Sequence, residues 1–338
     1  MELPRRILIG DSVIDKLGRF IEMPKTAKVV VASGTNVQEK VREKVATSLE
    51  GRAGWVDVFS SDMKNVRSVM RASKDARCIV GLGGGKSVDV GKLAASELDL
   101  PFFSVPTSAS HDGIASPFAS IRGTKKHYSV KAKPPVGILA DVDVIAAAPP
   151  RLFAAGCGDL VAKLTAVKDW QLGHDATGEY YGAYAASLAM MSARLVIDNS
   201  KRMGRADKSA VRDLVEALIS TGVAAGIAGS SRPCSGSEHL FSHALDVICP
   251  GKGLHGEKCG MGTILSAEMQ GLDWRSVKKA LKDVGAPTTA RELEITDDEV
   301  VEALVGSEAI RPDRYTILSR LKLDGRRARE VAETAGVI

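Results

Sequence analysis

The pattern of apolar residues changes near residue 150, and this change constrains the fold more than any other feature. Before it, short apolar runs such as that from Lys28 to Ala32 alternate with amphipathic stretches of helical spacing. Apolar runs separated by helices are typical of a parallel sheet covered by helices on both faces. After the Pro149-Pro150 pair the chain shows almost only helical spacing. The sequence therefore predicts an α/β domain over residues 1–150 and an all-helical domain over residues 151–338.

The expected elements follow from these runs. Strands are predicted at residues 6–9, 28–32, 55–59, 79–82 and 102–105, and helices at 12–20, 38–49 and 65–73. Residues 124–130 are predicted to form the turn and return strand of a hairpin. The helical stretches of the second domain are 159–172, 182–203, 208–226, 239–247, 260–271, 276–284, 297–306 and 325–335. Because parallel sheets bind ligands at the carboxyl ends of their strands, we expect a ligand near Gly34, Gly83 and Pro106.

Three consecutive glycines, Gly83 to Gly85, stand between a predicted strand and a helix expected from Val88. Glycines at such a junction let backbone N–H groups approach a phosphate at the positive end of the helix dipole. Two common nucleotide motifs do not fit, because a Walker A loop requires glycine at Val80 and the Rossmann motif requires glycine at Lys86. The alternative is a plain tight turn. Three glycines exceed what such a turn needs, which favours binding of a pyrophosphate group.

Three of the six histidines fall in one stretch of the second domain. His239 and His243 are four residues apart, so on a helix they share one face. His255 follows a Pro-Gly-Lys-Gly break that lets the chain return to the same place. Imidazole nitrogens bind divalent metals and exchange protons near neutral pH. The stretch therefore predicts a metal or catalytic site, and the alternative is that these histidines cap helices or face solvent.

Composition narrows the class of protein. The chain has 338 residues, of which 44% are apolar and 26% charged, which is typical of a globular protein with room for two cores. A net charge of +5 without a dense basic run does not suggest nucleic-acid binding. The five cysteines are odd in number and form no Cys-x-x-Cys pair, so no disulfide framework is expected. With no signal peptide or membrane-spanning run evident, we expect a cytoplasmic protein that is not integral to a membrane.

Five motifs follow one another along the chain: Gly83 to Lys92, Pro106 to Gly113, Gly156 to Asp159, Ser235 to His243, and His255-Gly256. Together, and in this order, they resemble the polyol dehydrogenase superfamily, which contains iron-containing alcohol dehydrogenases, glycerol dehydrogenase and dehydroquinate synthase. Residues 110–113 and 235–243 look most like the sn-glycerol-1-phosphate dehydrogenase family. This resemblance, which covers essentially the whole chain, implies a dehydroquinate synthase-like fold. It also implies reversible, zinc-dependent reduction of dihydroxyacetone phosphate to sn-glycerol 1-phosphate by NADH or NADPH, supplying the glycerol backbone of archaeal ether phospholipids.

The resemblance implies one zinc ion bound by an aspartate and two histidines, which correspond to Asp159, His239 and His255. We expect Asp159 in the first turn of a helix, where a carboxylate can reach a cation, and helix N-capping is the alternative. Lys163 stands where the alcohol dehydrogenases of the superfamily have another metal-binding histidine. A protonated lysine cannot ligate a cation. Three protein ligands then leave an open position, as a catalytic zinc requires. We expect Lys163 to contact the substrate phosphate, and the alternative is a surface lysine.

The resemblance also distributes the remaining roles. The candidate catalytic residues are Asp112, Lys163 and His243, which together with Asp159 are expected to contact the substrate. The first group of expected NAD(P) contacts, near the diphosphate, is Gly85, Lys86, Ser87, Val88 and Asp89. The second group, nearer the nicotinamide, is Thr107, Ser108, Ala109, Ser110 and Ser116.

Three other functions stay open at this point. The first is a polyol dehydrogenase that acts on an unphosphorylated substrate, and the second is a lyase resembling dehydroquinate synthase. The third is a nucleotide-binding regulatory protein with a structural zinc. The sequence does not decide between NAD and NADP, nor between zinc and another divalent metal. The expected partners are a small-molecule substrate and further copies of the same chain.

Overall fold

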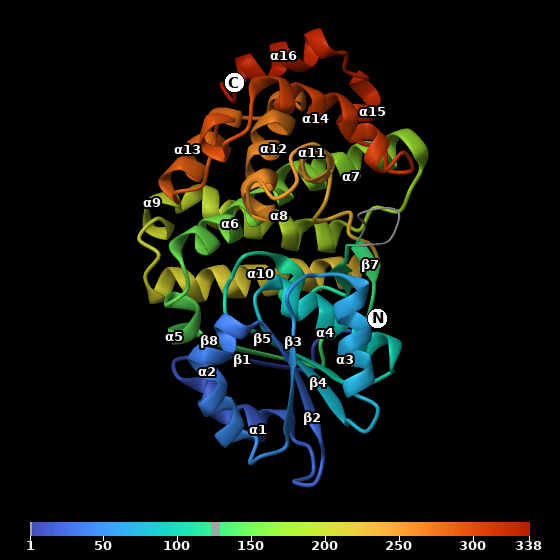
Figure 1. Ribbon diagram of the computed structural model, residues 1–338. Coiled ribbons are helices and arrows are strands. Elements are labelled where there is room, and N and C mark those ends of the chain that lie inside the picture. The colour runs from blue at the N-terminus through green and yellow to red at the C-terminus, as the bar shows by residue number, and fades with distance from the viewer. Residues whose placement is uncertain (1, 123–128) are drawn as a thin grey trace. The chain divides into compact units, whose positions relative to one another are not determined.

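Six short strands in the first half of the chain pair in parallel into one sheet, as the alternating pattern predicts (Figure 1). In this computed structural model, which describes residues 2–122 and 129–338, their order is β1-β8-β5-β4-β2-β3. The strands are β1 (Arg6–Gly10), β2 (Val29–Ser33), β3 (Ala53–Asp57), β4 (Cys78–Gly83), β5 (Phe102–Pro106) and β8 (Gly137–Asp141). The first five coincide with predicted strands to within two residues. Strand β8 has no predicted counterpart, because a five-residue apolar run alone does not identify a strand.

Alternate residues of the strands face two separate cores. On β2, Val29 and Val31 pack with η1 (Val13–Lys16), α1 (Leu17–Ile21) and α2 (Thr35–Ser48). The intervening Val30 and Ala32 pack with α3 (Met63–Ala72) and α4 (Gly85–Glu97). Successive side chains of a strand point to opposite faces, so a strand covered on both faces is apolar throughout. This explains why β2 reads as an unbroken apolar run.

The strand order reverses between β2 and β4, which are neighbours in the sheet. The chain runs from β2 to β3 on one side and then returns to β4 on the other. In open parallel sheets, ligands bind at the carboxyl ends of the strands at such a reversal. Strands β2, β4 and β5 are adjacent, so their ends at Ser33, Gly83 and Pro106 lie along one edge. The glycine run therefore lies at the position that the topology favours for a ligand.

Shorter elements follow β5. These are η2 (Asp112–Ile114), the antiparallel pair β6 (Phe118–Ser120) and β7 (Ser129–Lys131), and α5 (Val142–Ala146). The pair is the predicted hairpin, although the expected turn at 124–128 lies outside the described residues.

The rest of the chain is helical, and in the described residues no strand follows β8 (Figure 1). The helices are α6 (Pro150–Val161), α7 (Lys163–Thr177), α8 (Ala183–Asp198), α9 (Ser200–Met203), α10 (Lys208–Ala228), α11 (Ser237–Ile248), α12 (His255–Met269), α13 (Trp274–Asp283), η3 (Arg291–Leu293), α14 (Asp297–Ile310), α15 (Ile317–Leu321) and α16 (Gly325–Thr334). Apolar spacing accounts for them, as α13 illustrates by burying Val277, Ala280 and Leu281 on one face. Across the described residues, no helix is both long and apolar enough to span a membrane.

The contacts divide the chain into two units. Unit 1 comprises Met1–Ala148 and Val211–Gly226, and unit 2 comprises Pro149–Ala210 and Ile227–Ile338. The first change from unit 1 to unit 2, between Ala148 and Pro149, lies beside the domain boundary expected at residue 150. The middle of α10, residues 211–226, belongs to unit 1 and not to the helical unit. A single domain boundary at residue 150 does not predict this assignment. Helical spacing identifies a helix but does not say which core the helix packs against.

Three helix boundaries differ from the predicted ones in ways that matter for the site. Helix α4 begins at Gly85, three residues before the expected start at Val88. His255 is the first residue of α12 and does not lie in a preceding loop. The expectation that Asp159 lies in the first turn of a helix is wrong, because Asp159 lies in the last turn of α6. The prediction began the helix after Gly156 and Gly158 because glycines often interrupt helices. In the structure both glycines lie within α6.

Candidate active site

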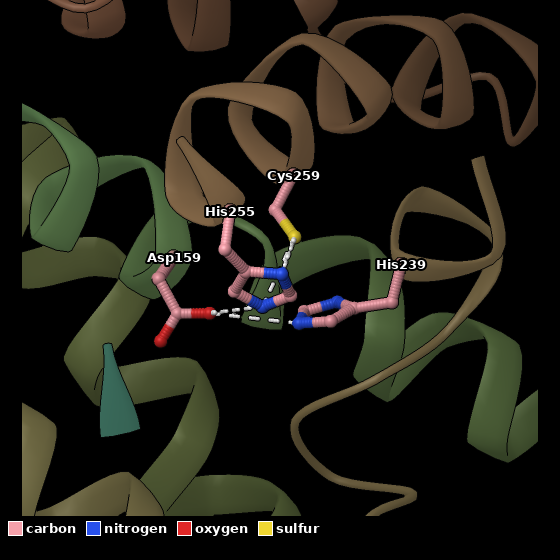
Figure 2. A group of neighbouring side chains, drawn as sticks. All are labelled: Asp159, His239, His255 and Cys259. Carbon is pink, nitrogen blue, oxygen red and sulfur yellow. Dashed lines mark hydrogen bonds and ion pairs between the residues drawn. The ribbon is translucent and has the colours of Figure 1, made fainter. Parts of the chain in front are cut away.

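Four side chains that could ligate a metal converge in unit 2. They are Asp159, His239, His255 and Cys259, and one donor atom from each lies within 4.8 Å of all the others (Figure 2). Nε2 of His239 is 3.5 Å from Oδ1 of Asp159, and Nε2 of His255 is 3.8 Å from the same oxygen. The first three residues are those to which the family resemblance assigned the metal.

The spacing of these donors fits a single cation. Ligand atoms bound tetrahedrally at the usual zinc–nitrogen and zinc–oxygen lengths lie roughly 3.4 Å from one another. The separations between Asp159 and the two imidazoles, 3.5 and 3.8 Å, are close to this value. Two imidazole nitrogens and a carboxylate suit zinc and several other divalent metals. The described residues therefore fit the metal that the family implies.

Close helix packing brings Asp159 to His255. A Cβ atom on Gly256, in the first turn of α12, would lie 1.8 Å from the carbonyl oxygen of Ala155 in α6. The absence of a side chain therefore lets the two backbones touch. At the same end, the Arg151 guanidinium of α6 donates two hydrogen bonds, 2.6 and 2.7 Å long, to the Glu257 carboxylate of α12. These contacts fix the first half of α6 against the start of α12.

A buried carboxylate positions the helix that carries His239. Asp169 of α7 accepts a 2.6 Å hydrogen bond from the backbone N–H of Ser237, the first residue of α11. Burial, together with the nearby Glu238 carboxylate, raises the pKa of Asp169 to about 6. An ion pair between Lys258 and Asp246 joins α12 to α11 further along. The two histidine-bearing helices are thus held to each other and to α7.

Glu238 orients the imidazole of His239. Its Oε1 lies 2.7 Å from Nδ1 of His239, and its Oε2 accepts a 2.8 Å hydrogen bond from the Thr165 hydroxyl. A carboxylate at Nδ1 keeps a proton there and turns Nε2 toward Asp159, on the side where it could ligate a metal. The sequence patterns did not identify Glu238. Adjacent residues of a helix point in different directions, so its position next to His239 gave no signal.

Lys163 faces Asp159 across the junction between α6 and α7. Its ammonium is fully buried, and Nζ lies 3.0 Å from Oδ1 of Asp159. Burial by itself raises the pKa of Asp159, but the Lys163 charge and the His239 imidazole lower it well below its ordinary value. Asp159 is therefore an anion at neutral pH, as a metal ligand must be. The alternative of Lys163 as a surface residue is wrong, because its side chain is buried.

His243 lies beside this group, four residues after His239 on α11. Its ring centre is 6.0 Å from that of His255, and its Nδ1 is 3.9 Å from the Asp246 carboxylate. Burial lowers the pKa of His243, so the imidazole is neutral at pH 7. Cys259, by contrast, was not among the expected site residues. Its spacing of four from His255 places both on one face of α12, and that spacing could have identified it.

The glycine run, Gly83 to Gly85, joins the end of β4 to the start of α4 in unit 1. Gly84 precedes the helix, and Gly85 is its first residue. A Cβ atom on Gly85 would lie 1.9 Å from Nε2 of His111, so the His111 ring occupies the space beside this glycine. Nδ1 of His111 accepts a 2.9 Å hydrogen bond from the N–H of Gly113, which holds the ring there. Of the other expected residues in this turn, Lys86 is exposed, whereas Ser87 and Val88 are buried.

Asp89 is buried and has internal partners. Its Oδ2 accepts a 3.1 Å hydrogen bond from the N–H of Ser120, and its Oδ1 lies 3.4 Å from Nζ of Lys92. The buried Lys92 ammonium also donates 2.6 Å hydrogen bonds to the carbonyl oxygens of Gly113 and Phe118. The pair therefore holds the segment after β5 against α4.

That segment carries the remaining expected residues of unit 1. Ser108, Ala109 and Ser116 are buried, whereas Thr107 and Ser110 are partly exposed. The backbone N–H of Thr107 donates a 3.0 Å hydrogen bond to the carbonyl oxygen of Gly83, which ties the ends of β5 and β4 together. Asp112 begins η2 and is partly exposed. The expected cofactor residues and Asp112 thus belong to unit 1, and the expected metal ligands, Lys163 and His243 belong to unit 2.

Solved structures share this fold over nearly the whole chain. Glycerol dehydrogenase from Schizosaccharomyces pombe has a TM-score of 0.79 at 21% identity, covering 99% of this chain and 90% of that one. NADH-dependent butanol dehydrogenase A from Thermotoga maritima has a TM-score of 0.73 at 19% identity, covering 99% and 98% of the two chains. At these identities the likeness shows the fold alone, which is the dehydroquinate synthase-like fold that the resemblance implied.

Sequence comparisons are more specific. Residues 8–149 match the iron-containing alcohol dehydrogenase family. Glycerol-1-phosphate dehydrogenase [NAD(P)+] from Nitrosopumilus maritimus is 50% identical, covering 100% of this chain and 97% of that one. The enzymes of the same name from Cenarchaeum symbiosum and Methanosarcina acetivorans are 51% and 44% identical, covering 100% and 94% of this chain and 96% and 91% of theirs. This protein therefore belongs to the glycerol-1-phosphate dehydrogenase family.

Proposed function

We propose that this protein catalyses the reversible, NAD(P)-linked interconversion of dihydroxyacetone phosphate and sn-glycerol 1-phosphate. The observation that carries the proposal is the full-length similarity to relatives named for that activity, at 44–51% identity. The convergence of Asp159, His239 and His255 in unit 2 supports it independently of any name. In this proposal the reaction supplies the glycerol backbone of ether phospholipids.

The proposed metal is zinc, held by Asp159, His239 and His255. A cation bound there would polarise the carbonyl of the substrate, and a bound nicotinamide would supply the hydride. The separations of the donors support this ligand set. Glu238 supports it further, because it holds the Nδ1 proton of His239 and so keeps Nε2 free to ligate.

The proposed cofactor contacts lie in unit 1. Gly85, Lys86, Ser87, Val88 and Asp89 would surround the diphosphate, and Thr107, Ser108, Ala109, Ser110 and Ser116 would lie nearer the nicotinamide. Two features support the first group. The amino end of a helix such as α4 directs its first backbone N–H groups outward and attracts anions. In addition, α4 follows β4 at the reversal of the strand order. Because Asp89 is engaged with Lys92 and Ser120, we propose that it acts by shaping the turn.

Three further side chains would act on the substrate. Lys163 would contact the phosphate through its ammonium group, which carries three donors and lies beside Asp159. His243 and Asp112 would orient the substrate and handle the proton at its secondary hydroxyl. The neutral state and the position of the His243 imidazole beside His255 support this role.

A spectrophotometric assay of the purified protein tests the function. Dihydroxyacetone phosphate should drive oxidation of NADH or NADPH, and the product should be sn-glycerol 1-phosphate when its chirality is determined. Equal turnover of unphosphorylated dihydroxyacetone would favour a polyol dehydrogenase. If no keto substrate drives net oxidation of the cofactor, the lyase or the regulatory function would be favoured instead. The cytoplasmic location and the homo-oligomer expected from the sequence are also proposals. Light scattering on the protein as it elutes from a size-exclusion column tests the oligomeric state.

Replacing Lys163 tests phosphate recognition. A charge-assisted contact with a phosphate contributes roughly 1.5–3 kcal/mol, or about ten- to a hundredfold in affinity. Lys163→Ala should therefore raise the Michaelis constant for dihydroxyacetone phosphate by about that factor relative to that for dihydroxyacetone. Lys168→Ala, at an exposed position on the same helix, is the matched control. Equal losses for the two substrates would show that Lys163 serves the metal or the proton path instead of the phosphate.

A further inference from the structure

We propose that the thiol of Cys259 is a fourth ligand of the metal held by Asp159, His239 and His255. The inference rests on the proposed metal site, and it adds a residue to the three ligands that the family resemblance implies. It also addresses which metal the site prefers, which aspartate and histidine ligands alone do not determine.

The position of the sulfur supports direct ligation. Cys259 lies four residues after His255, on the same face of α12, and Sγ is 3.5 Å from Nε2 of His255 (Figure 2). The zinc–sulfur bond is longer than the zinc–nitrogen bond, so a thiolate and an imidazole on one tetrahedral zinc lie roughly 3.6 Å apart. The observed distance is close to this value. All four donor atoms lie within 4.8 Å of one another.

The other cysteines provide an internal comparison. All five are buried thiols, so burial alone does not distinguish Cys259. Within the part of the chain that the structure describes, only Cys259 belongs to a group of possible metal ligands. A thiol that served only to fill a core would have no need of two imidazoles and a carboxylate around it.

The chemistry of a thiol also permits ligation. A thiol that binds a divalent metal loses its proton, so a bound cation would hold Cys259 as a thiolate.

Ligation by sulfur predicts which metals bind well. A thiolate is a soft ligand that favours zinc and cobalt over magnesium and manganese, which prefer oxygen. Because zinc sites also accept a fifth ligand, four protein ligands are compatible with the proposed activity.

Cobalt provides a spectroscopic test that does not depend on turnover. The metal-free full-length protein is loaded with Co²⁺, which absorbs strongly in the near-ultraviolet when a thiolate is bound and shows visible bands when its coordination is tetrahedral. We expect both features in the wild-type protein. Cys259→Ser should lose the near-ultraviolet band, whereas Cys249→Ser should keep it. By competition with a chelator, Cys259→Ser should bind zinc at least about tenfold more weakly and bind manganese with unchanged affinity.

The outcomes separate this inference from the proposed function. Wild-type protein that binds Co²⁺ with tetrahedral visible bands but without a thiolate band overturns the role of Cys259 and leaves the three-ligand site intact. Protein that binds no Co²⁺ overturns both proposals. Because the wild-type spectrum is measured without any substitution, misfolding of Cys259→Ser does not prevent the test.

Discussion

At the scale of single residues, the site combines side chains that the sequence motifs identified with others that they did not. Asp159, His239 and His255 lie together, but Glu238 and Cys259 complete their surroundings. The sequence argument for a catalytic zinc was that three protein ligands leave a position open. A fourth donor at Cys259 would fill that position, so the assignment as an enzyme rests on the family.

Gly85 provides a prediction at this scale, because two explanations of the glycine are possible. A side chain there would strike the His111 ring, and it would also obstruct the approach of a diphosphate to the backbone. Gly85→Ala should therefore weaken NADH binding, as measured by fluorescence titration. In the double variant with His111→Ala, the clash inside the protein is removed. We expect NADH binding to stay weak in that variant, whereas full recovery would mean that Gly85 serves only to accommodate His111.

At the scale of elements, close contact between α6 and α12 brings two of the proposed metal ligands, Asp159 and His255, together. The contact requires the absence of a side chain at Gly256, where a Cβ would meet the backbone carbonyl of Ala155. Because backbone atoms cannot move aside as a flexible side chain can, an added methyl group must separate the two helices. Separation would move Asp159 away from His255, so the packing of the helices and the binding of the metal are coupled.

Gly256→Ala tests this coupling. We expect it to lower the free energy of unfolding by about 1–3 kcal/mol, as overpacking of a tight contact does, and to weaken zinc binding as well. Gly306→Ala on α14 is the matched control, since no atom lies within 4 Å of the added Cβ. The control should stabilise the protein by roughly 0.5–1 kcal/mol, because alanine favours a helix over glycine. Unchanged zinc affinity in Gly256→Ala would contradict the role of this contact.

The start of α3 predicts a dependence on pH. Asp62 caps the helix by accepting a 2.8 Å hydrogen bond from the N–H of Asn65. Hydrogen bonds from Ser60 and Asn65 lower its pKa from 3.8 to about 2. A carboxylate whose pKa is lowered by folding stabilises the protein above its unfolded pKa, and this contribution is lost as the pH falls through the folded pKa. Its stabilising effect should therefore disappear between about pH 4 and about pH 2.

Urea unfolding of Asp62→Ala checks this expectation. At pH 7 the variant should be less stable than the wild type by about 1 kcal/mol, the usual contribution of an N-cap. The difference should shrink steadily below about pH 4. Asp75→Ala, at an exposed position of the same unit, should show no such trend. A difference that is constant across this pH range would mean that the charge of Asp62 does not contribute.

At the scale of the whole molecule, the two proposed sites belong to different units. The proposed cofactor residues lie in unit 1 and the proposed metal ligands in unit 2. Each group is held by contacts inside its own unit: Asp89 and Lys92 in the first, and the helix contacts around α12 in the second. The binding of the cofactor should therefore be separable from the binding of the metal.

Removing the metal tests this separation. After dialysis against a chelator, turnover of dihydroxyacetone phosphate should be lost and should return when zinc is added. The affinity for NADH, measured by fluorescence titration in the absence of substrate, should stay within about twofold of its original value, a change of less than about 1 kcal/mol. Loss of NADH binding together with the metal would show that the turn at Gly85 depends on unit 2.

The sequence by itself determined the kinds of elements and the candidate residues for the chemistry. Apolar runs and helical spacing depend on local periodicity, so five strands and most helices could be located from the chain alone. The family motifs identified Asp159, His239 and His255 as candidate metal ligands. Each motif is a short contiguous stretch of sequence, so it can be found without the tertiary structure. Strand β8 was missed because its short run has no distinguishing period.

Only the tertiary structure decided what those residues contact. Glu238 meets His239, Cys259 lies beside the proposed metal ligands and Lys163 pairs with Asp159 because particular helices pack at particular distances. Such distances depend on features such as the bare backbone at Gly256, which local sequence patterns do not reveal. The grouping of the middle of α10 with unit 1 has the same cause. Periodicity tells which face of a helix is apolar, whereas the partner of that face is chosen by packing over the whole chain.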